Sequence, residues 1–331
     1  MFLFLIFMCW GVSAAPNKAQ YYSLEDAASY FEEFIIKHGK QYADEQEKSA
    51  RFEIFKANLK DVNQLNNITQ ATVFGITSFT DLTKDEFKRL YSNCFIGEQD
   101  TSCSLKTDGD IPDAGAPESL DYRQMGYVSG VKNQMTCGDC YAFSSTGHLE
   151  GQYFKKHGSM QEFSEQQILD CNQKSSGCRG GTMGSSFATL IDLGGAMAER
   201  DYPYENQKGQ CRSDASRAVA RISACYQYSL SSQEKVKQLL YLVGPISIAV
   251  RDDYLKQYTG GIIMDSVCTG KVAHAVLLVG YGTDNGVDYW LIKNSWGAQR
   301  GEQGYFRVQR NGGPDGACGL LNQGMASADV E

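Results

Sequence analysis

The chain has 331 residues, which is long enough for two domains or for one domain with an appended segment. Its hydrophobic fraction of 42% and charged fraction of 21% are typical of globular proteins and exclude an extended disordered chain. The net charge of −8 argues against a nucleic-acid partner, because binding to the phosphate backbone depends on clustered Lys and Arg.

The first element in chain order is an apolar run from Phe2 to Val12, followed by small residues with Ala14 as the predicted cleavage point. The run has the length of a signal peptide and is shorter than the ~20 apolar residues that span a bilayer. No Lys or Arg precedes it, which leaves a buried N-terminal strand as the alternative. We therefore expect a signal peptide over residues 1–14, no membrane span, and a secretory route on which the cysteines meet an oxidising compartment.

Residues 22–66 form the next segment, which is rich in helix-forming residues and contains no Pro. Steps of four, four, three, four and four residues keep one set of its side chains on a single helical face. This set comprises Glu47, Arg51, Phe55, Asn58, Val62 and Asn66. The spacing alone predicts an ordinary amphipathic helix, in which Glu47 and Arg51 are placed for an ion pair.

The stretch Lys106–Pro117 reads KTDGDIPDAGAP. Its Gly, Asp and Pro content predicts an exposed linker with little to bury. Proteolytic nicking concentrates in such linkers. We therefore expect a boundary near residues 112–116, followed by a body over residues 116–331 that has a suitable size for one domain.

The first half of this body is predicted to contain a helix over Asp139–His157, because Gly158 follows it as an expected helix terminator. From Gly244 onward, short β-rich runs are separated by Gly, Asp and Asn: PISIAV, HAVLLVGYG, DYWLIKNSWG and GYFRVQR. A helical half followed by a strand-rich half predicts an α+β fold with a cleft between the two.

Two cysteines, Cys137 and Cys140, lie three residues apart at the start of the predicted helix. A zinc site is disfavoured, since the sequence has no second CxxC and no two His spaced three to five residues apart. A thioredoxin-like redox pair is the alternative, although the large strand-rich half fits it poorly. The third option is a nucleophile at Cys140, whose thiolate the helix N-terminus would favour.

A cysteine nucleophile needs a base, in practice a His. Of the four His, His38 precedes the predicted linker. His148 and His157 lie on the predicted helix itself, about 12 and 25 Å along its axis from Cys140. This leaves His274, in the strand-rich half, as the candidate base, with a buried structural His as the alternative.

The stretch KNSWG follows His274 after about twenty residues. Its Asn294 can hold an imidazole in one tautomer, and Trp296 can shield that hydrogen bond from water. Read by itself, NSWG would be only a turn after a strand. The combination of CxxC, His274 and Asn294 is much more specific than any of its parts.

With these residues the chain resembles the papain family of cysteine proteases, in its cathepsin L-like branch. The family pattern C-G-[SA]-C-[WY] reads CGDCY here, with His274 and Asn294 placed 134 and 154 residues after Cys140. Glu47–Asn66 resembles the helix pattern of the family pro-segment, and Gly75, Phe79 and Asp81 resemble its next motif. ESLDYRQMGYVSGVKNQ resembles the start of a mature enzyme, which places maturation near Ala116.

The resemblance implies a papain-like α+β fold, with a helical left domain, a β-barrel-like right domain and a helical N-terminal inhibitory pro-segment. It divides the chain into a signal peptide (1–14), an inhibitory propeptide (15–115) and a mature protease (116–331). Protonation of carboxylates such as Asp81 would loosen the propeptide in acid. The implied activity is that of an endopeptidase, since no paired-His insertion follows Cys140.

The resemblance also assigns the catalytic roles. Cys140 would be the nucleophile, His274 its ion-pair partner and Asn294 the residue that orients His274. The side-chain amide of Gln134 and the backbone N–H of Cys140 would form the oxyanion hole. No cofactor and no metal ion are implied.

Three disulfides follow from the resemblance, each between two cysteines of the mature body: Cys137–Cys178, Cys171–Cys211 and Cys268–Cys318. Cys225 has no counterpart among these pairs and is expected to be a free thiol. From spacing only, Cys94 and Cys103 are expected to pair with each other.

The residues expected to bind substrate are Gly180, Gly181, Thr182, Met183, Ala249, Val272, Ala275, Trp296 and Gln323. Most of those lining the pocket for the second residue before the cut are apolar, which predicts aliphatic or aromatic side chains there. Asn67 begins the single N-glycosylation acceptor. The expected partners are protein and peptide substrates, the chain's own propeptide and cystatin-like inhibitors, for a monomer in lysosomes or outside cells.

Three residues depart from the family pattern near the predicted site: Asp139, Tyr141 and Ala273, the last standing where an Asp is common. We hypothesise that Asp139 partly replaces the charge missing at position 273, so that Asp139→Ser would shift the pH–rate profile. The same departures motivate a rival interpretation, in which the chain is a non-catalytic relative that acts as a binding or decoy protein.

Overall fold

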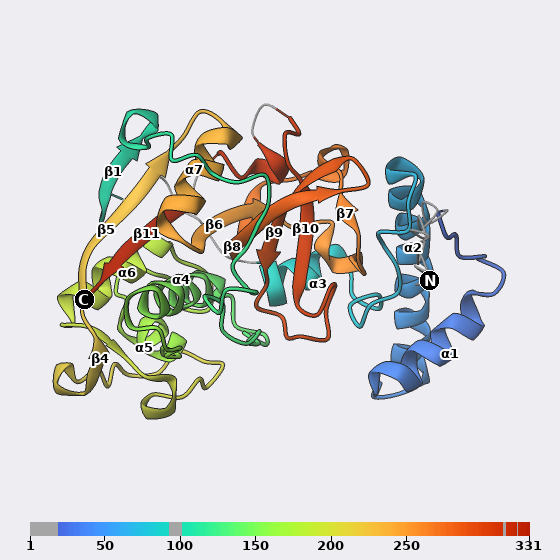
Figure 1. Ribbon diagram of the computed structural model, residues 1–331. Helices are drawn as coiled ribbons and strands as arrows, with labels where there is room; N and C mark the ends of the chain where they lie inside the picture. Colours follow the sequence, from blue (N-terminus) through green and yellow to red (C-terminus); the bar gives the residue numbers. More distant parts are fainter. Residues whose placement is uncertain (1–18, 93–100, 314–315, 323) are drawn as a thin grey trace, which may run out of the picture.

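The computed structural model describes residues 19–92, 101–313, 316–322 and 324–331 (Figure 1). The predicted signal peptide therefore lies outside the described residues, as do Cys94 and Gln323. Among the described residues, no helix combines the length and the apolar character that a membrane crossing requires.

The N-terminal part of the protein consists of helices, as the sequence predicts. They are α1 (Ala27–His38), α2 (Glu45–Thr69) and the short α3 (Lys84–Phe87), which continues into a π-helical turn over Lys88–Ser92. Gly39 adopts a left-handed conformation with φ of 58° and ends α1, and the helix predicted from the spacing of Glu47 to Asn66 lies within α2. Buried aromatic rings of Phe31, Phe34 and Phe55 hold α1 against α2.

The body contains four further α-helices in its described residues. They are α4 (Cys140–His157), α5 (Glu165–Cys171), α6 (Met183–Asp192) and α7 (Gln233–Val243). Helix α4 agrees with the prediction to within one residue and ends at Gly158, where φ is 69°. Its first twelve residues are all buried, so this helix forms the centre of the helical lobe.

A sheet of nine strands forms most of the second half, as the β-rich runs predict. The strands of the body are β1 (Ser104–Thr107), β2 (Leu120–Asp121), β3 (Ala196–Met197), β4 (Ala218–Ala220), β5 (Ile222–Ser229), β6 (Ile246–Arg251), β7 (Ile262–Ile263), β8 (Val272–Asp284), β9 (Val287–Lys293), β10 (Tyr305–Gln309) and β11 (Met325–Val330). The large sheet has the order β1-β5-β11-β6-β8-β9-β10-β7, with β2 paired to β8, while β3 and β4 form a separate pair.

The lobes are arranged so that the strands from β6 to β10 lie between two groups of helices (Figure 1). Helices α4, α5 and α6 lie on one side, and α1 and α2 on the other. This arrangement agrees with the two-lobe α+β fold and the helical N-terminal segment that the resemblance implies. The site must therefore lie where α4 meets β8, because these elements pack directly against each other.

The predicted linker Lys106–Pro117 is wrong in its first half. Strand β1 runs parallel to β5 in the main sheet, and a 3₁₀ turn over Asp108–Asp110 follows it. Ile111 is 5% exposed and belongs to the main hydrophobic core. Sequence composition missed the strand because it is only four residues long and is stabilised by its partner strand.

Four disulfides join described cysteines. Three of them are Cys137–Cys178, Cys171–Cys211 and Cys268–Cys318, the pairs that the resemblance implies. The fourth is Cys103–Cys225, which joins positions 122 residues apart. The expectations of a free Cys225 and of a Cys94–Cys103 pair are therefore wrong, because the β1–β5 pairing brings Cys103 to within 5.0 Å of Cys225, measured between Cα atoms.

Candidate active site

Cys140 is the first residue of α4 and is completely buried. Its Sγ accepts a hydrogen bond of 3.1 Å from the backbone N–H of Ala275 on β8, which places the sulfur beside the strand residue that follows His274. The N-terminus of α4 favours negative charge at this sulfur, because the first N–H groups of a helix have no partners within the helix.

His274 and Asn294 form a direct pair across neighbouring strands. The His274 Nε2 and the Asn294 Oδ1 are 2.8 Å apart, and the Trp296 ring stacks on the imidazole with centroids 4.6 Å apart. The other ring nitrogen, Nδ1, is buried without a hydrogen-bond partner among the described residues. Burial lowers the pKa of His274 to about 4, against the opposing effect of the Asn294 hydrogen bond.

Gln134 is buried next to this pair, at the base of the helical lobe. Its Nε2 donates to the backbone oxygen of Cys137 at 2.9 Å, and its Oε1 accepts from the Ser295 hydroxyl at 2.6 Å. Its backbone N–H also donates to the Ser295 carbonyl at 2.8 Å. The amide is therefore fixed with its nitrogen toward Cys137 and with one N–H still available to a ligand.

Gly180 and Gly181 lie in a loop that packs against Tyr141, the residue after Cys140. A Cβ atom on Gly181 would come within 3.0 Å of the Tyr141 ring, so only Gly fits there. The Tyr141 hydroxyl donates to Ser175 Oγ at 3.1 Å and to the Gly177 carbonyl at 3.3 Å. Tyr141 thus anchors the loop that carries Gly180 and Gly181, two of the residues expected to bind substrate.

The predicted specificity residues come together around the nucleophile. Met183, Ala249 and Ala275 are buried in the same apolar cluster as Cys140, with Val272 packed against it. Ala249 and Ala275 are cross-strand partners on β6 and β8. Thr182 caps α6 by accepting from the Ser185 N–H, and Gln323 lies outside the described residues.

The Asp139 carboxyl group is hydrogen-bonded to Tyr204. It is fully buried, and the Tyr204 hydroxyl donates to its Oδ1 at 3.0 Å while its Oδ2 has no partner among the described residues. Burial raises the pKa of Asp139 well above its ordinary value, although the Tyr204 hydrogen bond opposes this. The groups that act on His274 do not include Asp139, so the structure does not support the hypothesis that Asp139 replaces the charge missing at Ala273.

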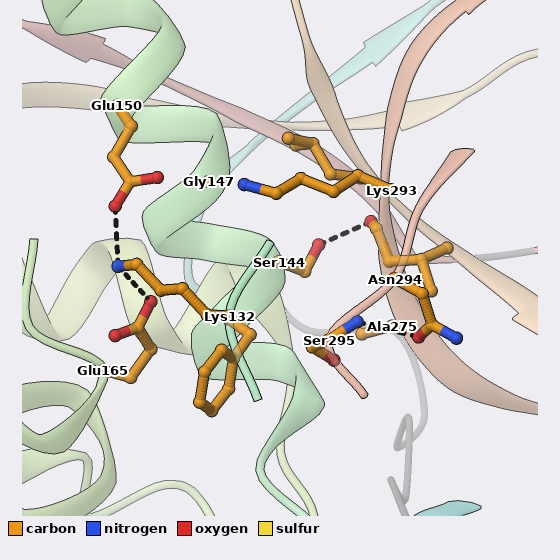
Figure 2. Close-up of a pocket in the computed structure, with 12 residues that line it drawn as sticks. Lys132, Ser144, Gly147, Glu150, Glu165, Ala275, Lys293, Asn294 and Ser295 are labelled. Atoms are coloured by element: carbon orange, nitrogen blue, oxygen red, sulfur yellow. Dashed lines mark hydrogen bonds and ion pairs between the residues drawn. The ribbon is translucent and has the colours of Figure 1, made fainter. Parts of the chain in front are cut away.

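A buried charged cluster lies behind the site (Figure 2). The Lys132 Nζ is 2.8 Å from both the Glu150 and the Glu165 carboxylates. The Ser129 hydroxyl donates to Glu150 and accepts from the Lys293 Nζ at 2.9 Å. Because Glu150 lies on α4 and Lys293 immediately precedes Asn294, this network links the element that carries Cys140 to the one that carries Asn294.

A cavity of about 20 Å³ lies among these charged side chains, bounded by Asn294 and Ser295 on the strand side. This is room for about one water molecule. Burial alone would lower the pKa of Lys132, but Glu150 and Glu165 raise it above its ordinary value, so this side chain stays protonated. The cluster is therefore a fixed ionic support for the site and not a second reactive centre.

The N-terminal segment covers the strand side of the site. The rings of Phe79, Phe87 and Tyr91 surround Trp296 edge-on, with centroids 6.0, 5.4 and 6.4 Å from it. The guanidinium of Arg300 lies 3.8 Å above the Phe79 ring. Since Trp296 covers His274 in turn, these aromatic side chains contribute an outer layer over the imidazole.

The backbone of the same segment pairs with a loop of the body. The Gly75 N–H donates to the Gln257 carbonyl at 2.8 Å, and the Thr259 N–H donates to the Val73 carbonyl at 3.0 Å. The Thr77 hydroxyl donates to the Lys256 carbonyl at 2.7 Å. These contacts fix the path of the segment before it reaches Phe79.

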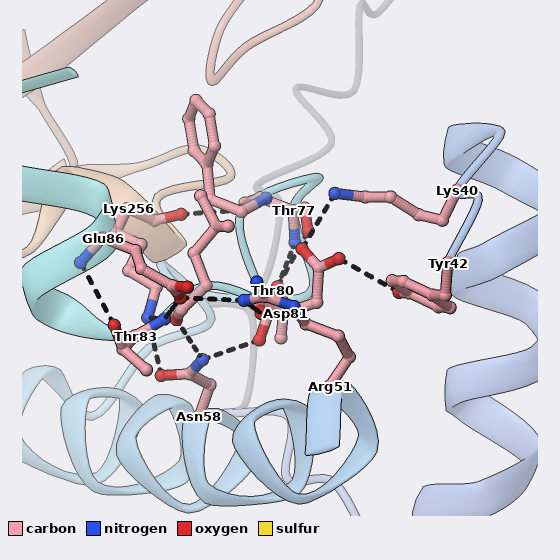
Figure 3. Close-up of polar contacts among 12 residues, drawn as sticks. Lys40, Tyr42, Arg51, Asn58, Thr77, Thr80, Asp81, Thr83, Glu86 and Lys256 are labelled. Atoms are coloured by element: carbon pink, nitrogen blue, oxygen red, sulfur yellow. Dashed lines mark hydrogen bonds and ion pairs between the residues drawn. The ribbon is translucent and has the colours of Figure 1, made fainter. Parts of the chain in front are cut away.

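Lys256 is the buried cation of this interface (Figure 3). Its Nζ donates to Asn58 Oδ1 at 2.7 Å and to the Leu82 carbonyl at 2.6 Å. Burial lowers its pKa to about 8. Burying the charged form of Lys256 is unfavourable, and this contribution is fully present below about pH 8. It does not grow as the pH falls further, so Lys256 is not an acid trigger.

Asp81, the predicted acid trigger, is bound within the N-terminal segment itself (Figure 3). Its carboxylate accepts from Lys40 at 2.8 Å and from the Tyr42 hydroxyl at 3.0 Å, and its carbonyl accepts from Arg51 at 3.1 Å. Arg51 also forms a 2.8 Å pair with Glu86. The hydrogen bond from Arg51 lowers the pKa of Glu86 to about 2.

Sequence reasoning missed several residues that shape the site. Ser295 orients Gln134, and Tyr204 satisfies Asp139. Ser295 lies inside the KNSWG stretch, so the motif pointed to it, but roles were predicted only for its neighbours Asn294 and Trp296. Tyr204 and Lys256 carry no local signal, because their partners are far away in the chain.

Comparison with protein families gives two matches. Residues 116–328 match the papain family cysteine proteases, and residues 31–87 match the cathepsin propeptide inhibitor domain. A viral cathepsin from Antheraea pernyi nuclear polyhedrosis virus is 42% identical over 310 residues, which cover 93% of this chain and 94% of the viral protein.

Solved proenzyme structures are also similar. The digestive procathepsin L2 proteinase from the larval midgut of Tenebrio molitor has a TM-score of 0.83 and 34% identity. The recombinant stem bromelain precursor has a TM-score of 0.82 and 33% identity. Each comparison covers 92% of this chain and 99% of the other, so the similarity includes the N-terminal helical segment.

Proposed function

Because the chain belongs to the papain family of cysteine proteases and carries a cathepsin propeptide inhibitor domain, we propose that Cys140, His274 and Asn294 are the residues with which it hydrolyses peptide bonds. The chain is a cysteine endopeptidase made as a zymogen. One observation carries the assignment of residues: the sulfur at the N-terminus of α4 meets β8 beside the His274–Asn294 pair.

In the proposed reaction the Cys140 thiolate attacks the scissile carbonyl and forms a new C–S bond. His274, protonated in the free enzyme, gives its proton to the leaving amine as the C–N bond breaks. Water, deprotonated by the now neutral His274, then hydrolyses the thioester and restores the thiolate. The hydrogen bond from Nε2 to Asn294 keeps Nδ1 directed at the reacting atoms throughout.

The charge that develops on the substrate oxygen needs donors that are already in place. The Gln134 amide is held by Ser295 and Cys137 before substrate arrives, which supports its assignment to the oxyanion hole. The backbone N–H of Cys140, at the start of α4, would be the second donor. Neither donor has to reorganise when the oxyanion forms.

Latency is proposed to arise from the aromatic cover over Trp296. Burial lowers the pKa of His274 to about 4 in the zymogen, which disfavours the imidazolium form. Removal of Phe79, Phe87 and Tyr91 would expose one side of Trp296 and weaken the desolvation of His274. Its pKa would then rise and the ion pair would assemble.

The apolar cluster of Met183, Ala249, Val272 and Ala275 supports a preference for aliphatic or aromatic side chains at the second substrate residue before the cut. Glycan attachment at Asn67 is proposed, since this residue is exposed in the last turns of α2. A secretory route to lysosomes or to the cell exterior, with cleavage of residues 1–14, is supported by four disulfides among the described residues. We further propose that the active form is a monomer and is inhibited by cystatin-like proteins.

The test is labelling of acid-activated, mildly reduced protein with an epoxysuccinyl peptide that alkylates active-site thiolates, read out by mass spectrometry. Stoichiometric labelling at Cys140, absent in Cys140→Ser, is the expected result. Protein that is folded, processed and reduced but remains unlabelled at Cys140 would support the non-catalytic interpretation instead.

A further inference from the structure

Residues 103–116, here called the strap, lead up to the first residue of the papain-family match, residue 116, and are built into the protease body. The first anchor is covalent, because Cys103 is bonded to Cys225 on β5. The second is the sheet itself. Ser104 to Thr107 pair in parallel register with Tyr226 to Ser229, so the strap supplies the outermost strand of the main sheet.

The anchors continue beyond the strand. Asp108 accepts from both the N–H and the hydroxyl of Ser231. The Ile111 side chain is buried in the main core, and its carbonyl accepts from Lys235 Nζ at 2.5 Å. All these partners belong to the protease body, which suggests that this part of the chain has a structural role in the enzyme and no inhibitory one.

The bond expected to be cut near Ala116 is itself held in place. The Ala114 and Ala116 N–H groups donate to the Gln238 Oε1 at 2.9 and 3.3 Å, and the Pro117 carbonyl accepts from the Tyr281 hydroxyl at 2.9 Å. A protease must draw several residues of its substrate into an extended path through its cleft. A segment fixed at three points within four residues has to open locally before it can be cut.

The inhibitory segment binds elsewhere. The propeptide inhibitor match ends at residue 87, and its contacts are with Lys256, Gln257 and Trp296 on the opposite side of the strands. Removal of this segment therefore does not require removal of the strap. Release of the strap would require both cleavage near residue 116 and reduction of the Cys103–Cys225 disulfide.

We propose that the maturation cut falls before Cys103, and that the strap remains in the active enzyme as its continuous N-terminal strand. This inference rests on the proposed function, because it assumes that the zymogen is processed to an active protease. It moves the start of the mature enzyme upstream of residue 116. The enzyme then has four disulfides in its own chain, of which Cys103–Cys225 fastens its N-terminus.

The test starts from full-length zymogen activated in acid and then treated with iodoacetamide without prior reduction. One portion is analysed directly, and a second after full reduction, by N-terminal sequencing and intact mass. We expect a single N-terminus that precedes Cys103 and is the same in both portions. An N-terminus near Ala116 would overturn the proposal, whether a strap peptide is released on reduction or is missing from the start.

A matched variant distinguishes the two ways in which the strap could stay attached, through an uncut chain or through the Cys103–Cys225 disulfide alone. In Cys103→Ser/Cys225→Ser zymogen we expect the activated enzyme to keep the strap, because an uncut chain needs no disulfide to hold it. Loss of the strap from this variant would mean that the strap is a nicked peptide and would overturn the proposal. If the variant does not fold, the wild-type result decides alone. Epoxysuccinyl labelling of Cys140 in a mildly reduced aliquot shows separately whether the proposed function holds.

Discussion

Ser295 shows how one hydroxyl can orient the side-chain amide of Gln134, the proposed oxyanion-hole donor. Its Oγ donates to the Gln134 Oε1 at 2.6 Å, and this bond decides which end of the amide faces the reacting centre. Ser295→Ala would let the amide rotate, so that part of the population presents an oxygen where a donor is needed.

We expect Ser295→Ala to lower kcat roughly tenfold with little change in KM, since the lost interaction is made in the transition state. Gln134→Ala should cost more, about 10²–10³-fold, as loss of an oxyanion donor does. Steady-state kinetics on a fluorogenic peptide measure both. Ser295→Thr keeps the hydroxyl and serves as the control, and an equal loss in Ser295→Thr would indicate a packing effect instead.

Asp139 is a carboxyl whose burial favours the protonated form. Because the folded state raises its pKa well above the ordinary value, the folded chain keeps a proton that the unfolded chain loses above about pH 4. Stability from this group therefore falls as pH rises from about 4 toward the pKa of the folded state. An Asn at this position imitates the protonated acid and still accepts from Tyr204.

We expect Asp139→Asn, in a Cys140→Ser background that prevents self-digestion, to raise Tm at pH 7 by roughly 2–4 °C, which corresponds to about 1 kcal/mol. The gain should be smaller at pH 4. Differential scanning calorimetry at the two values checks this. In the active enzyme the same substitution should leave the pH–rate profile unmoved, and a shifted acid limb would revive a role for Asp139 in the charge of His274.

At the scale of elements, the propeptide is an α1–α2 hairpin whose connection to α3 depends on ionic contacts. Arg51 on α2 pairs with Glu86 on α3, and Glu86 also accepts from the Thr83 N–H at the start of that helix. Since the pKa of Glu86 is lowered to about 2, its stabilising contribution is present above pH 4.5 and is lost as pH falls toward 2. This part of the acid sensitivity lies inside the propeptide.

We expect Glu86→Gln to convert the zymogen at a higher pH, with the midpoint shifted upward by roughly half a pH unit to one unit. The measurement is the fraction of zymogen converted after a fixed time across a pH series, read on gels. Glu32→Gln is the matched control, because Glu32 pairs with Lys48 on the exposed surface of the same segment, where ion pairs contribute little. Equal shifts in both variants would contradict a specific role for Glu86.

At the scale of the whole molecule, the sequence was most informative where signals are local. Helix α4 was predicted almost to the residue, because Gly158 ends it and an uninterrupted helical run precedes that Gly. The site was found by elimination among four His and by the spacing of Cys140, His274 and Asn294. The roles of these residues stay proposals until the labelling experiment is done.

What the sequence could not provide was pairing between distant segments. Strand β1 is only four residues long and runs into the predicted linker, and its register with β5 makes it part of the sheet. Cys225 was expected to be free because the resemblance implies no partner for it, whereas its partner Cys103 lies 122 residues away. Strand pairing and disulfide choice depend on the assembled fold, so no short window contains them.

The charged cluster of Lys132, Glu150, Glu165 and Lys293 has a consequence for how the protein denatures. The cluster spans the helical and the strand-rich lobe, so separating the two lobes would leave buried charges without partners. Each broken pair would destabilise the protein by roughly 3–5 kcal/mol. Neither lobe can therefore melt while the other stays intact. Calorimetry of the mature enzyme, inactivated at Cys140, should show one transition whose calorimetric and van't Hoff enthalpies agree. That result would mean that the two lobes on either side of the cleft unfold as a single cooperative unit.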